Sequence, residues 1–178
     1  MKTFDEIYDT LPGNGWLSRA EAELLYRAAS ECDGPILEVG CYEGRSTVLL
    51  ASLGRPVYAV DPFGGFHSED PSGERTFTTF ISNMASRKIT NVILTRKRIE
   101  DCYPILLSKF GFAYLDGDHT YRGTREQIEA AVWRQSDIIA IHDVNDSGDG
   151  AEVKRAALEL LGPWDERVER LAVWRMRR

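Results

Sequence analysis

The chain has 178 residues, of which 43% are hydrophobic, a formal net charge of −6 and an isoelectric point near 5.2. This length can bury one core, so we expect a single domain over residues 1–178, with a helical segment at 1–34 and an α/β core at 35–178. The negative charge opposes the basic surface that nucleic-acid binding requires, and we expect no nucleic-acid partner. Because the sequence contains no apolar run near the roughly 18 residues of a membrane span and no secretory pattern, we expect a cytoplasmic protein without a membrane partner.

Hydrophobic periodicity predicts alternating helices and strands. Residues 18–30 have apolar side chains at helical spacing, and Ser18 with Glu21 forms a capping-box pattern at the start of this helix. Strand-like runs follow at 36–39, 56–60, 91–95, 112–115 and 137–141. Helices are expected between and after them at 46–54, 76–88, 124–135 and 151–162, and the tail supplies two short strands joined by a tight turn. This order predicts an α/β fold with a mostly parallel sheet, helices on both faces and an antiparallel C-terminal strand.

The sequence ILEVGCYEGRST predicts a strand that runs into a glycine turn. Gly40 permits backbone angles that are closed to other residues and lets a ligand approach the main chain. Asp61 ends the next strand, 21 residues after Gly40, which suits the ribose of a nucleoside at the crevice of an open sheet. Tyr42 replaces the middle glycine of a dinucleotide-binding turn, and Glu38 adds negative charge. This turn therefore disfavours a pyrophosphate and tolerates a cationic sulfonium.

The E-x-G-x-x-x-G turn followed by Asp61 resembles the S-adenosylmethionine site of class I methyltransferases. The motifs DGDHTY, beginning at Asp116, and HD at His142 are similar to those of a bacterial group related to the catechol, cephalosporin-tailoring and macrolide-sugar O-methyltransferases. The resemblance covers most of residues 15–178. It implies a Rossmann-like fold, S-adenosylmethionine as the cofactor, and in-line transfer of its methyl group to a hydroxyl of a small-molecule acceptor.

The resemblance also implies how the cofactor is held. Glu38 would bind the methionine ammonium, directly or through water, and Asp61 would bind both ribose hydroxyls. Pro62 and Ile99 would lie against the adenine. Ser46 would reach the methionine carboxylate, although a helix-capping role is nearly as well supported. The expected cofactor-binding residues are Glu38, Gly40, Cys41, Tyr42, Gly44, Ser46, Asp61, Pro62, Ile99 and Asp116.

Two histidines, His119 and His142, follow the predicted fourth and fifth strands, at the edge where open α/β sheets bind ligands. The resemblance places a catalytic aspartate at Asp116 and the general base at His119, since histidine accepts protons near neutral pH. It places metal ligands at Asp116, His142 and Asp143. Magnesium prefers oxygen ligands, so the imidazole at position 142 leaves magnesium, manganese, another transition ion or no ion as alternatives.

The acceptor cannot be identified from these residues. Tyr121, Arg122, Trp16 and Phe66 are candidates to contact it, each with an ordinary packing role as the alternative. Residues 63–74 predict a loop at the mouth of the site. The sequence contains no inserted cap domain, so a homodimer is one way to enclose the acceptor. An NAD(P)-dependent oxidoreductase and a non-catalytic S-adenosylmethionine-binding module are the alternative functions.

Overall fold

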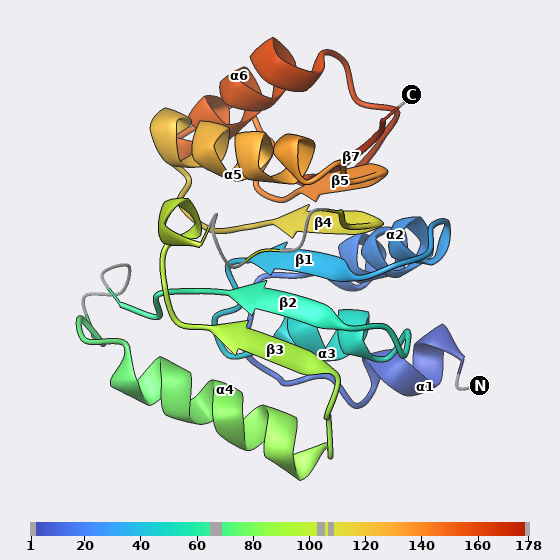
Figure 1. Cartoon of the computed structure of the whole chain (residues 1–178), viewed down its shortest axis with the longest axis vertical. Coiled ribbons are helices and arrows are strands. Elements are labelled where there is room, and N and C mark those ends of the chain that lie inside the picture. Colours follow the sequence, from blue (N-terminus) through green and yellow to red (C-terminus); the bar gives the residue numbers. More distant parts are fainter. Residues whose placement is uncertain (1–2, 65–68, 103–105, 107–108, 177–178) are drawn as a thin grey trace.

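The computed structural model describes residues 3–64, 69–102, 106 and 109–176, which form a sheet of seven strands with helices on both faces (Figure 1). The strand order is β3-β2-β1-β4-β5-β7-β6; the first five of these are parallel, and β7 is antiparallel to both β5 and β6. The strands are β1 (Ile36–Val39), β2 (Val57–Val60), β3 (Val92–Thr95), β4 (Phe112–Leu115), β5 (Ile138–Ile141), β6 (Glu166–Val168) and β7 (Leu171–Arg175). The predicted fold class is confirmed.

The helices lie close to their predicted positions. They are α1 (Phe4–Tyr8), α2 (Arg19–Ser30), α3 (Arg45–Ala51), α4 (Glu74–Ser86), the 3-10 turn η1 (Ile99–Asp101), α5 (Tyr121–Trp133) and α6 (Asp149–Leu161). The capping box of Ser18 and Glu21 is confirmed. The next four α-helices lie one to three residues before their predicted positions. They begin after N-caps that the periodicity of apolar residues did not reveal, such as Thr120, which accepts a hydrogen bond from the N–H of Gly123.

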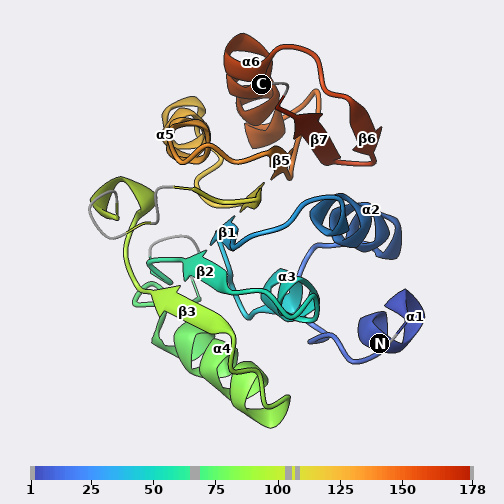
Figure 2. The same ribbon diagram turned by 45° about the vertical axis from the view of Figure 1, so that its right-hand side comes forward.

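Two hydrophobic cores lie on opposite faces of the sheet (Figure 2). Since successive side chains of a strand point to opposite faces, Ile36 packs with α2, α3 and α4, whereas Leu37 packs with α5 and α6. All four residues of β1, β4 and β5 are buried, as is usual for parallel strands covered on both sides. Among the described residues, no helix is long and apolar enough to cross a membrane. The cytoplasmic location remains a prediction.

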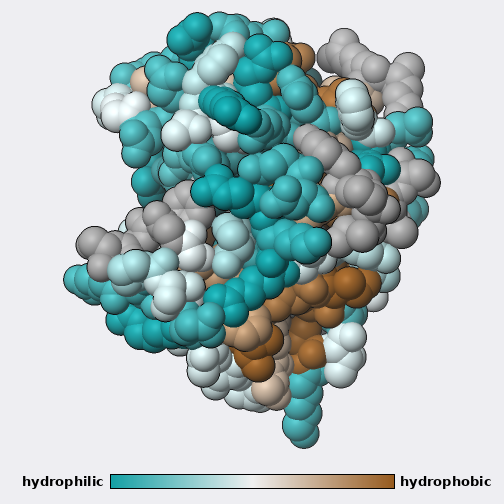
Figure 3. All heavy atoms as spheres, turned by 60° about the vertical axis from the view of Figure 1, so that its left-hand side comes forward, coloured by the Kyte–Doolittle hydropathy of each residue, from teal (hydrophilic) through white to brown (hydrophobic). Residues whose placement is uncertain are grey.

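The edge of the sheet at β3 has an apolar surface next to α4. Ile93 of β3 and Ile81 of α4 are both exposed, and Figure 3 shows hydrophobic residues gathered on this part of the molecule. Part of the predicted loop at 63–74 lies outside the described residues, and so does Phe66. The described part of the loop is anchored to α4, where Asp70 accepts hydrogen bonds from the backbone and the hydroxyl of Thr76.

The sheet reverses its direction of growth between β1 and β4, which are neighbours although β2 and β3 lie between them in the chain. Ligands of open α/β sheets bind outside the carboxyl ends of the strands at such a point. There the N–H of Asp116 donates to Val39 O at 2.8 Å, and the N–H of Gly40 donates to Val60 O at 3.0 Å. The glycine turn is therefore tied to the ends of both neighbouring strands.

Replacing Gly40 with alanine should destabilise the protein more than replacing Gly54. Both glycines have left-handed backbone angles, with φ of 85° and 75°, so each alanine costs about 1–2 kcal/mol. Only at Gly40 would the new Cβ meet other atoms, 2.1 Å from the carbonyl oxygen of Asp116; at Gly54 nothing lies within 4 Å. Since 1 kcal/mol shifts the Tm of a chain this size by about 2–4 °C, thermal unfolding should show a loss of about 2–8 °C for Gly54→Ala and at least twice that for Gly40→Ala. Equal losses of Tm in the two variants would contradict the close approach of the Asp116 carbonyl oxygen to position 40.

Candidate active site

A cavity of about 570 Å³ lies at the carboxyl ends of the parallel strands. Its wall combines the glycine turn after β1, the ends of β2, β4 and β5, the residues around η1, and part of the segment before α2. The predicted cofactor-binding residues that line it are Gly40, Cys41, Tyr42, Ser46, Asp61, Pro62, Ile99 and Asp116. Glu38 and Gly44 do not line it. Gly44 instead caps α3 and packs against α4, where a Cβ would lie 2.5 Å from Met84 Cε.

Asp61 holds the glycine turn in place. Its Oδ2 accepts hydrogen bonds from the N–H groups of Cys41 at 2.6 Å and Tyr42 at 2.9 Å, and its Oδ1 accepts one from Phe63 at 2.6 Å. A carboxylate offers about four acceptor positions, so room remains for a ligand hydroxyl. The sequence placed Asp61 at the crevice, but it did not reveal that this carboxylate orders the turn.

Glu38 lies fully buried beneath the cavity, next to Ser46. The Ser46 hydroxyl donates to Glu38 Oε1 at 2.6 Å, while Glu38 Oε2 is buried without a hydrogen-bond partner in the described structure. Burial raises the pKa of Glu38 to about 8. A buried acceptor oxygen without a donor fits a cationic group bound above it. The capping alternative for Ser46 is wrong, because Gly44 is the N-cap of α3.

Strained backbone lies around the cavity. Tyr42, Phe63 and Asp143 line it and have left-handed backbone angles, with φ of 47°, 61° and 56°. Such angles are uncommon for residues other than glycine and tend to occur at functional sites, where the surrounding structure enforces them. At Tyr42 and Phe63 the enforcing contacts are the hydrogen bonds to Asp61.

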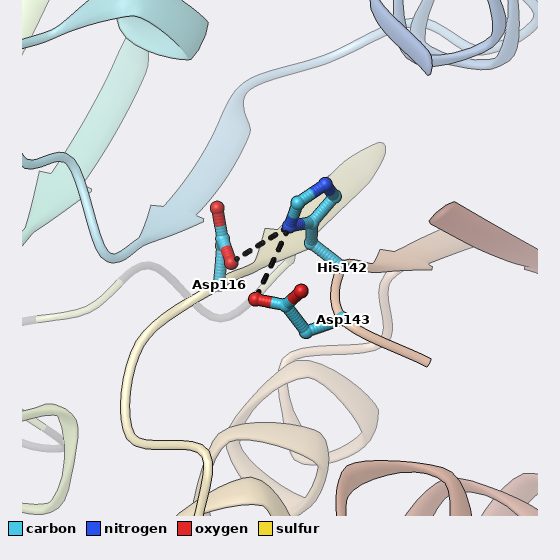
Figure 4. Close-up of side chains that lie close together, drawn as sticks. All are labelled: Asp116, His142 and Asp143. Carbon is cyan, nitrogen blue, oxygen red and sulfur yellow. Dashed lines mark ion pairs between the residues drawn. The ribbon is translucent and has the colours of Figure 1, made fainter. Parts of the chain in front are cut away.

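A cluster of charged groups lies at the ends of β4 and β5 (Figure 4). Nδ1 of the buried His142 lies 3.3 Å from Asp116 Oδ1 and 3.5 Å from Asp143 Oδ2. Asp116 is held from its other side by the hydroxyl of Tyr114, which donates to Oδ2 at 3.0 Å. Arg170, from the turn between β6 and β7, lies 2.9 Å from Asp143 Oδ1. Both carboxylates are therefore fixed by contacts from two sides.

Glu21 is a member of this cluster that the sequence did not reveal. This buried side chain on α2 lies 3.3 Å from His142 Nε2 and accepts hydrogen bonds from the N–H groups of Ser18 and Arg170. Burial alone would raise the pKa of Glu21, but the contacts with His142 and Ser18 outweigh it and lower the pKa to about 2. Burial likewise opposes the charge on His142, but the facing carboxylates raise its pKa to about 12. The capping box already accounted for the glutamate at position 21, so nothing in the sequence indicated that Glu21 also contacts His142.

His119 lies at the open side of the same cluster. Its Nε2 is 3.5 Å from Asp116 Oδ1 and 3.6 Å from Asp143 Oδ2, and the residue lines the cavity. Contact with Asp116 raises the pKa of His119 above its ordinary value. His119 is thus a stronger base than a free histidine, held by two carboxylates at the edge of the cavity.

The donor set also fits a divalent ion of the transition series. Asp116, His142 and Asp143 each offer one ligand atom, and these atoms lie within 4.8 Å of one another. Metal–ligand bonds of about 2.0–2.2 Å put neighbouring ligand atoms roughly 3.0–3.6 Å apart, which matches the distances around His142. His142 Nδ1 faces both carboxylates, so an ion bound there would displace the Nδ1 proton and take over the positive charge that balances Asp116 and Asp143. An imidazole ligand favours manganese, iron or zinc over magnesium.

Comparison with known proteins agrees with this geometry. A family model described as a methyltransferase domain matches residues 37–144, which span the glycine turn, Asp61, Asp116, His119 and the end of β5. The chain belongs to this methyltransferase family. It is a class I S-adenosylmethionine-dependent methyltransferase, and this excludes the oxidoreductase alternative. No curated protein sequence matches the chain.

Solved structures share the fold of this methyltransferase. CalS11, a TDP-rhamnose 3'-O-methyltransferase of calicheamicin biosynthesis, has a TM-score of 0.62 and 19% identity, over 97% of this chain and 91% of CalS11. SMU.1697c from Streptococcus mutans, crystallised with S-adenosylhomocysteine, has a TM-score of 0.63 and 16% identity, over 85% of this chain and 93% of that protein. At these identities the similarity establishes the fold.

Two candidate acceptor contacts of the methyltransferase, Tyr121 and Arg122, lie outside the cavity wall. Because α5 begins at Tyr121, three residues before its predicted start, the Tyr121 hydroxyl points to α6 and donates to Glu159. Arg122 pairs with Glu126 on the surface of α5. Trp16 does line the cavity, as expected.

Replacing Glu21 with glutamine should lower the stability of the methyltransferase in a pH-dependent way. A carboxylate with a depressed pKa contributes stability that is fully present above its ordinary pKa of 4.5 and is lost as the pH falls towards about 2. Removing one partner of a buried charge pair costs about 3–5 kcal/mol. Thermal unfolding should therefore show a wide gap between wild type and Glu21→Gln at pH 7, which narrows between pH 4.5 and 2. Glu23→Gln, on the exposed side of α2, is the control and should show no such gap.

Proposed function

We propose that this methyltransferase methylates a hydroxyl group of a small-molecule acceptor, with His119 as the general base. The observation that carries the proposal is the position of His119, whose Nε2 faces Asp116 and Asp143 in the cavity that also contains the glycine turn. A base with a raised pKa beside the cofactor site suits an acceptor that must lose a proton.

The cofactor would lie between the glycine turn and the end of β4. S-adenosylmethionine supplies a methyl group on a cationic sulfur. The Ser46 hydroxyl, which lines the cavity, would bind its amino-acid part, with the buried Glu38 behind it, and Asp61 Oδ1 has an acceptor position left for a ribose hydroxyl. Pro62 and Ile99 line the wall where the adenine would pack.

The chain accelerates the reaction mainly by positioning. Asp116 and Asp143 both face Nε2 of His119 and keep the proton on that nitrogen, so Nδ1 takes the hydroxyl proton and the carboxylates stabilise the imidazolium that results. Holding the acceptor oxygen in line with the methyl carbon, roughly 3–3.5 Å away, is the larger part of such catalysis. Asp116 serves both functions, because it lines the cofactor cavity and contacts His119.

The acceptor is proposed to be a small molecule and not a nucleic acid, in keeping with the net charge of −6. The name of CalS11 supports a sugar hydroxyl as one acceptor class.

A homodimer is proposed too, and the apolar surface with Ile81 and Ile93 is a candidate interface. Size-exclusion chromatography with light scattering tests it. The non-catalytic module is the remaining alternative, and the cavity-facing base argues against it.

Replacing His119 with alanine should abolish most of the activity while cofactor binding is kept. General-base catalysis contributes about 10²–10⁴-fold, so kcat should fall by that factor for acceptors found in a panel of sugars, phenols and hydroxy acids. Calorimetry with S-adenosylhomocysteine should give a Kd within about threefold of wild type. Tyr121→Phe is the control, because its hydroxyl contacts α6 outside the cavity. Full activity in His119→Ala would remove the histidine from the mechanism.

We also propose that Asp116, His142 and Asp143 bind a divalent ion, with manganese favoured over magnesium by the imidazole ligand. Equilibrium dialysis of the purified protein with Mn²⁺ or Co²⁺ should show one bound ion, and Co²⁺ should give a visible absorption band. Asp143→Asn should weaken binding at least about tenfold, whereas Asp146→Asn, a nearby exposed acid paired with Lys154, should not. No ion uptake by the wild type would leave His142 and Asp143 with a purely structural role.

A further inference from the structure

Trp16 is a large aromatic side chain at the mouth of the main cavity. It is 61% exposed and lies in the segment between α1 and α2, with Gly15 and Leu17 beside it in the cavity wall. Its ring centroid is 5.2 Å from that of Tyr42, and the planes are tilted by 44°. The two rings thus form an aromatic corner above the glycine turn, in contact with the cavity.

The segment that carries Trp16 is held firmly in this position. Arg45, the first residue of α3, donates to the carbonyl oxygens of Pro12 at 2.5 Å and Leu17 at 3.3 Å. Asn14 donates to Glu43 at 2.7 Å, and Arg170 donates to Trp16 O at 3.4 Å. The backbone is therefore fixed on both sides of Trp16 while the indole stays largely exposed. Tryptophan is enriched at interfaces, because it combines a large apolar face with one polar N–H group.

A second cavity of about 650 Å³ adjoins the first at this aromatic corner. Gly15, Trp16 and Tyr42 line both cavities, so the two rings form the shared wall. The other described residues that line the second cavity are mainly polar and include side chains of both charges: Gly13, Asn14, Glu43, Glu69, Arg75 and Thr79. A hydroxyl-rich group without net charge suits such a lining.

The size of the main cavity limits what it can hold. Pockets of about 300–1,000 Å³ each take one drug-sized ligand, and the cofactor alone is of that size. With the cofactor bound, only part of the 570 Å³ cavity is left for the reactive ring of an acceptor. A further part of the acceptor would extend past Trp16, where the second cavity adjoins the first.

We propose that the acceptor has two ring-sized parts, and that Trp16 and Tyr42 bind the second part while the first lies beside His119. This inference rests on the proposed O-methyltransferase function and names its substrate class. The ring faces of Trp16 and Tyr42 would pack on an apolar ring face, either of an aromatic group or of a sugar. Where the second part carries hydroxyls, as a sugar does, the polar lining of the second cavity would bind them.

Matched pairs of acceptors test this inference. Each pair shares a reactive ring, which in one member carries no second ring and in the other is joined to one: methyl and phenyl glycosides of glucose and of rhamnose, and catechol with 4-phenylcatechol. Formation of S-adenosylhomocysteine gives KM and kcat. For the pairs that react, the two-ring member should have a KM at least about tenfold lower, with kcat within about threefold.

Variants at two exposed tryptophans assign the effect. Trp16→Ala should abolish the preference for the two-ring member, and Trp16→Phe should retain most of it. Trp133→Ala is the control, because Trp133 is 75% exposed on α5 and lines neither cavity. Calorimetry with S-adenosylhomocysteine should give the same Kd for all four proteins, which shows that the cofactor site is intact.

The inference is overturned if no two-ring acceptor is preferred, if no pair reacts although S-adenosylhomocysteine binds, or if Trp16→Ala retains the preference. The assignment of His119 as the general base is tested independently of the aromatic subsite. If His119→Ala were fully active while Trp16→Ala lost the preference, His119 would be rejected as the base and the two-ring acceptor would stand. If instead His119→Ala lost its activity while Trp16→Ala kept the preference for two-ring acceptors, only the aromatic subsite would be rejected.

Discussion

The buried imidazole of His142 is the constraint on which the active site depends. Three carboxylates lie within 3.5 Å of its two ring nitrogens: Glu21 on one side, and Asp116 and Asp143 on the other. Buried charges of one sign are costly unless an opposite charge compensates them. His142 supplies that charge, and Arg170 adds a second at Asp143. The positions of α2, β4, β5 and the turn between β6 and β7 are therefore coupled through one side chain.

The same cluster determines where chemistry can occur. Since Asp116 contacts His142, Tyr114 and His119 at once, its carboxylate has little freedom to rotate, and His119 is held at the cavity edge. On the opposite wall, Asp61 constrains the glycine turn through three backbone N–H groups. Two carboxylates thus fix the two sides of one cavity before any ligand arrives, which lowers the entropy cost of binding and orientation.

Sequence reasoning succeeded where one local rule decides the structure. Apolar runs predicted the five parallel strands, and the ends of parallel strands meet at one edge, so Asp116, His119, His142 and Asp143 were expected together. It failed where a tertiary contact decides. Glu21 had a sufficient local explanation as a capping residue, although it is also buried against His142. Tyr121 was a candidate acceptor contact because it follows the DGDH motif, but α5 begins at this residue and the Tyr121 hydroxyl contacts Glu159 of α6. The order that Asp61 imposes on the glycine turn likewise could not be predicted from spacing alone.

The segment before β1 was predicted to be a helical segment separate from the α/β core, but it has two roles in the site. Through Glu21 it contributes a charge to the cluster around His142, and through Gly15, Trp16 and Leu17 it forms part of the cavity wall. The cofactor side of the cavity is built from strand ends and backbone groups, which tolerate little change. The wall around Trp16 belongs to no helix or strand and is held by side-chain hydrogen bonds from Arg45 and Arg170. Residues in that wall can change without disturbing the sheet, so acceptor selection can vary there while the geometry around His119 is preserved.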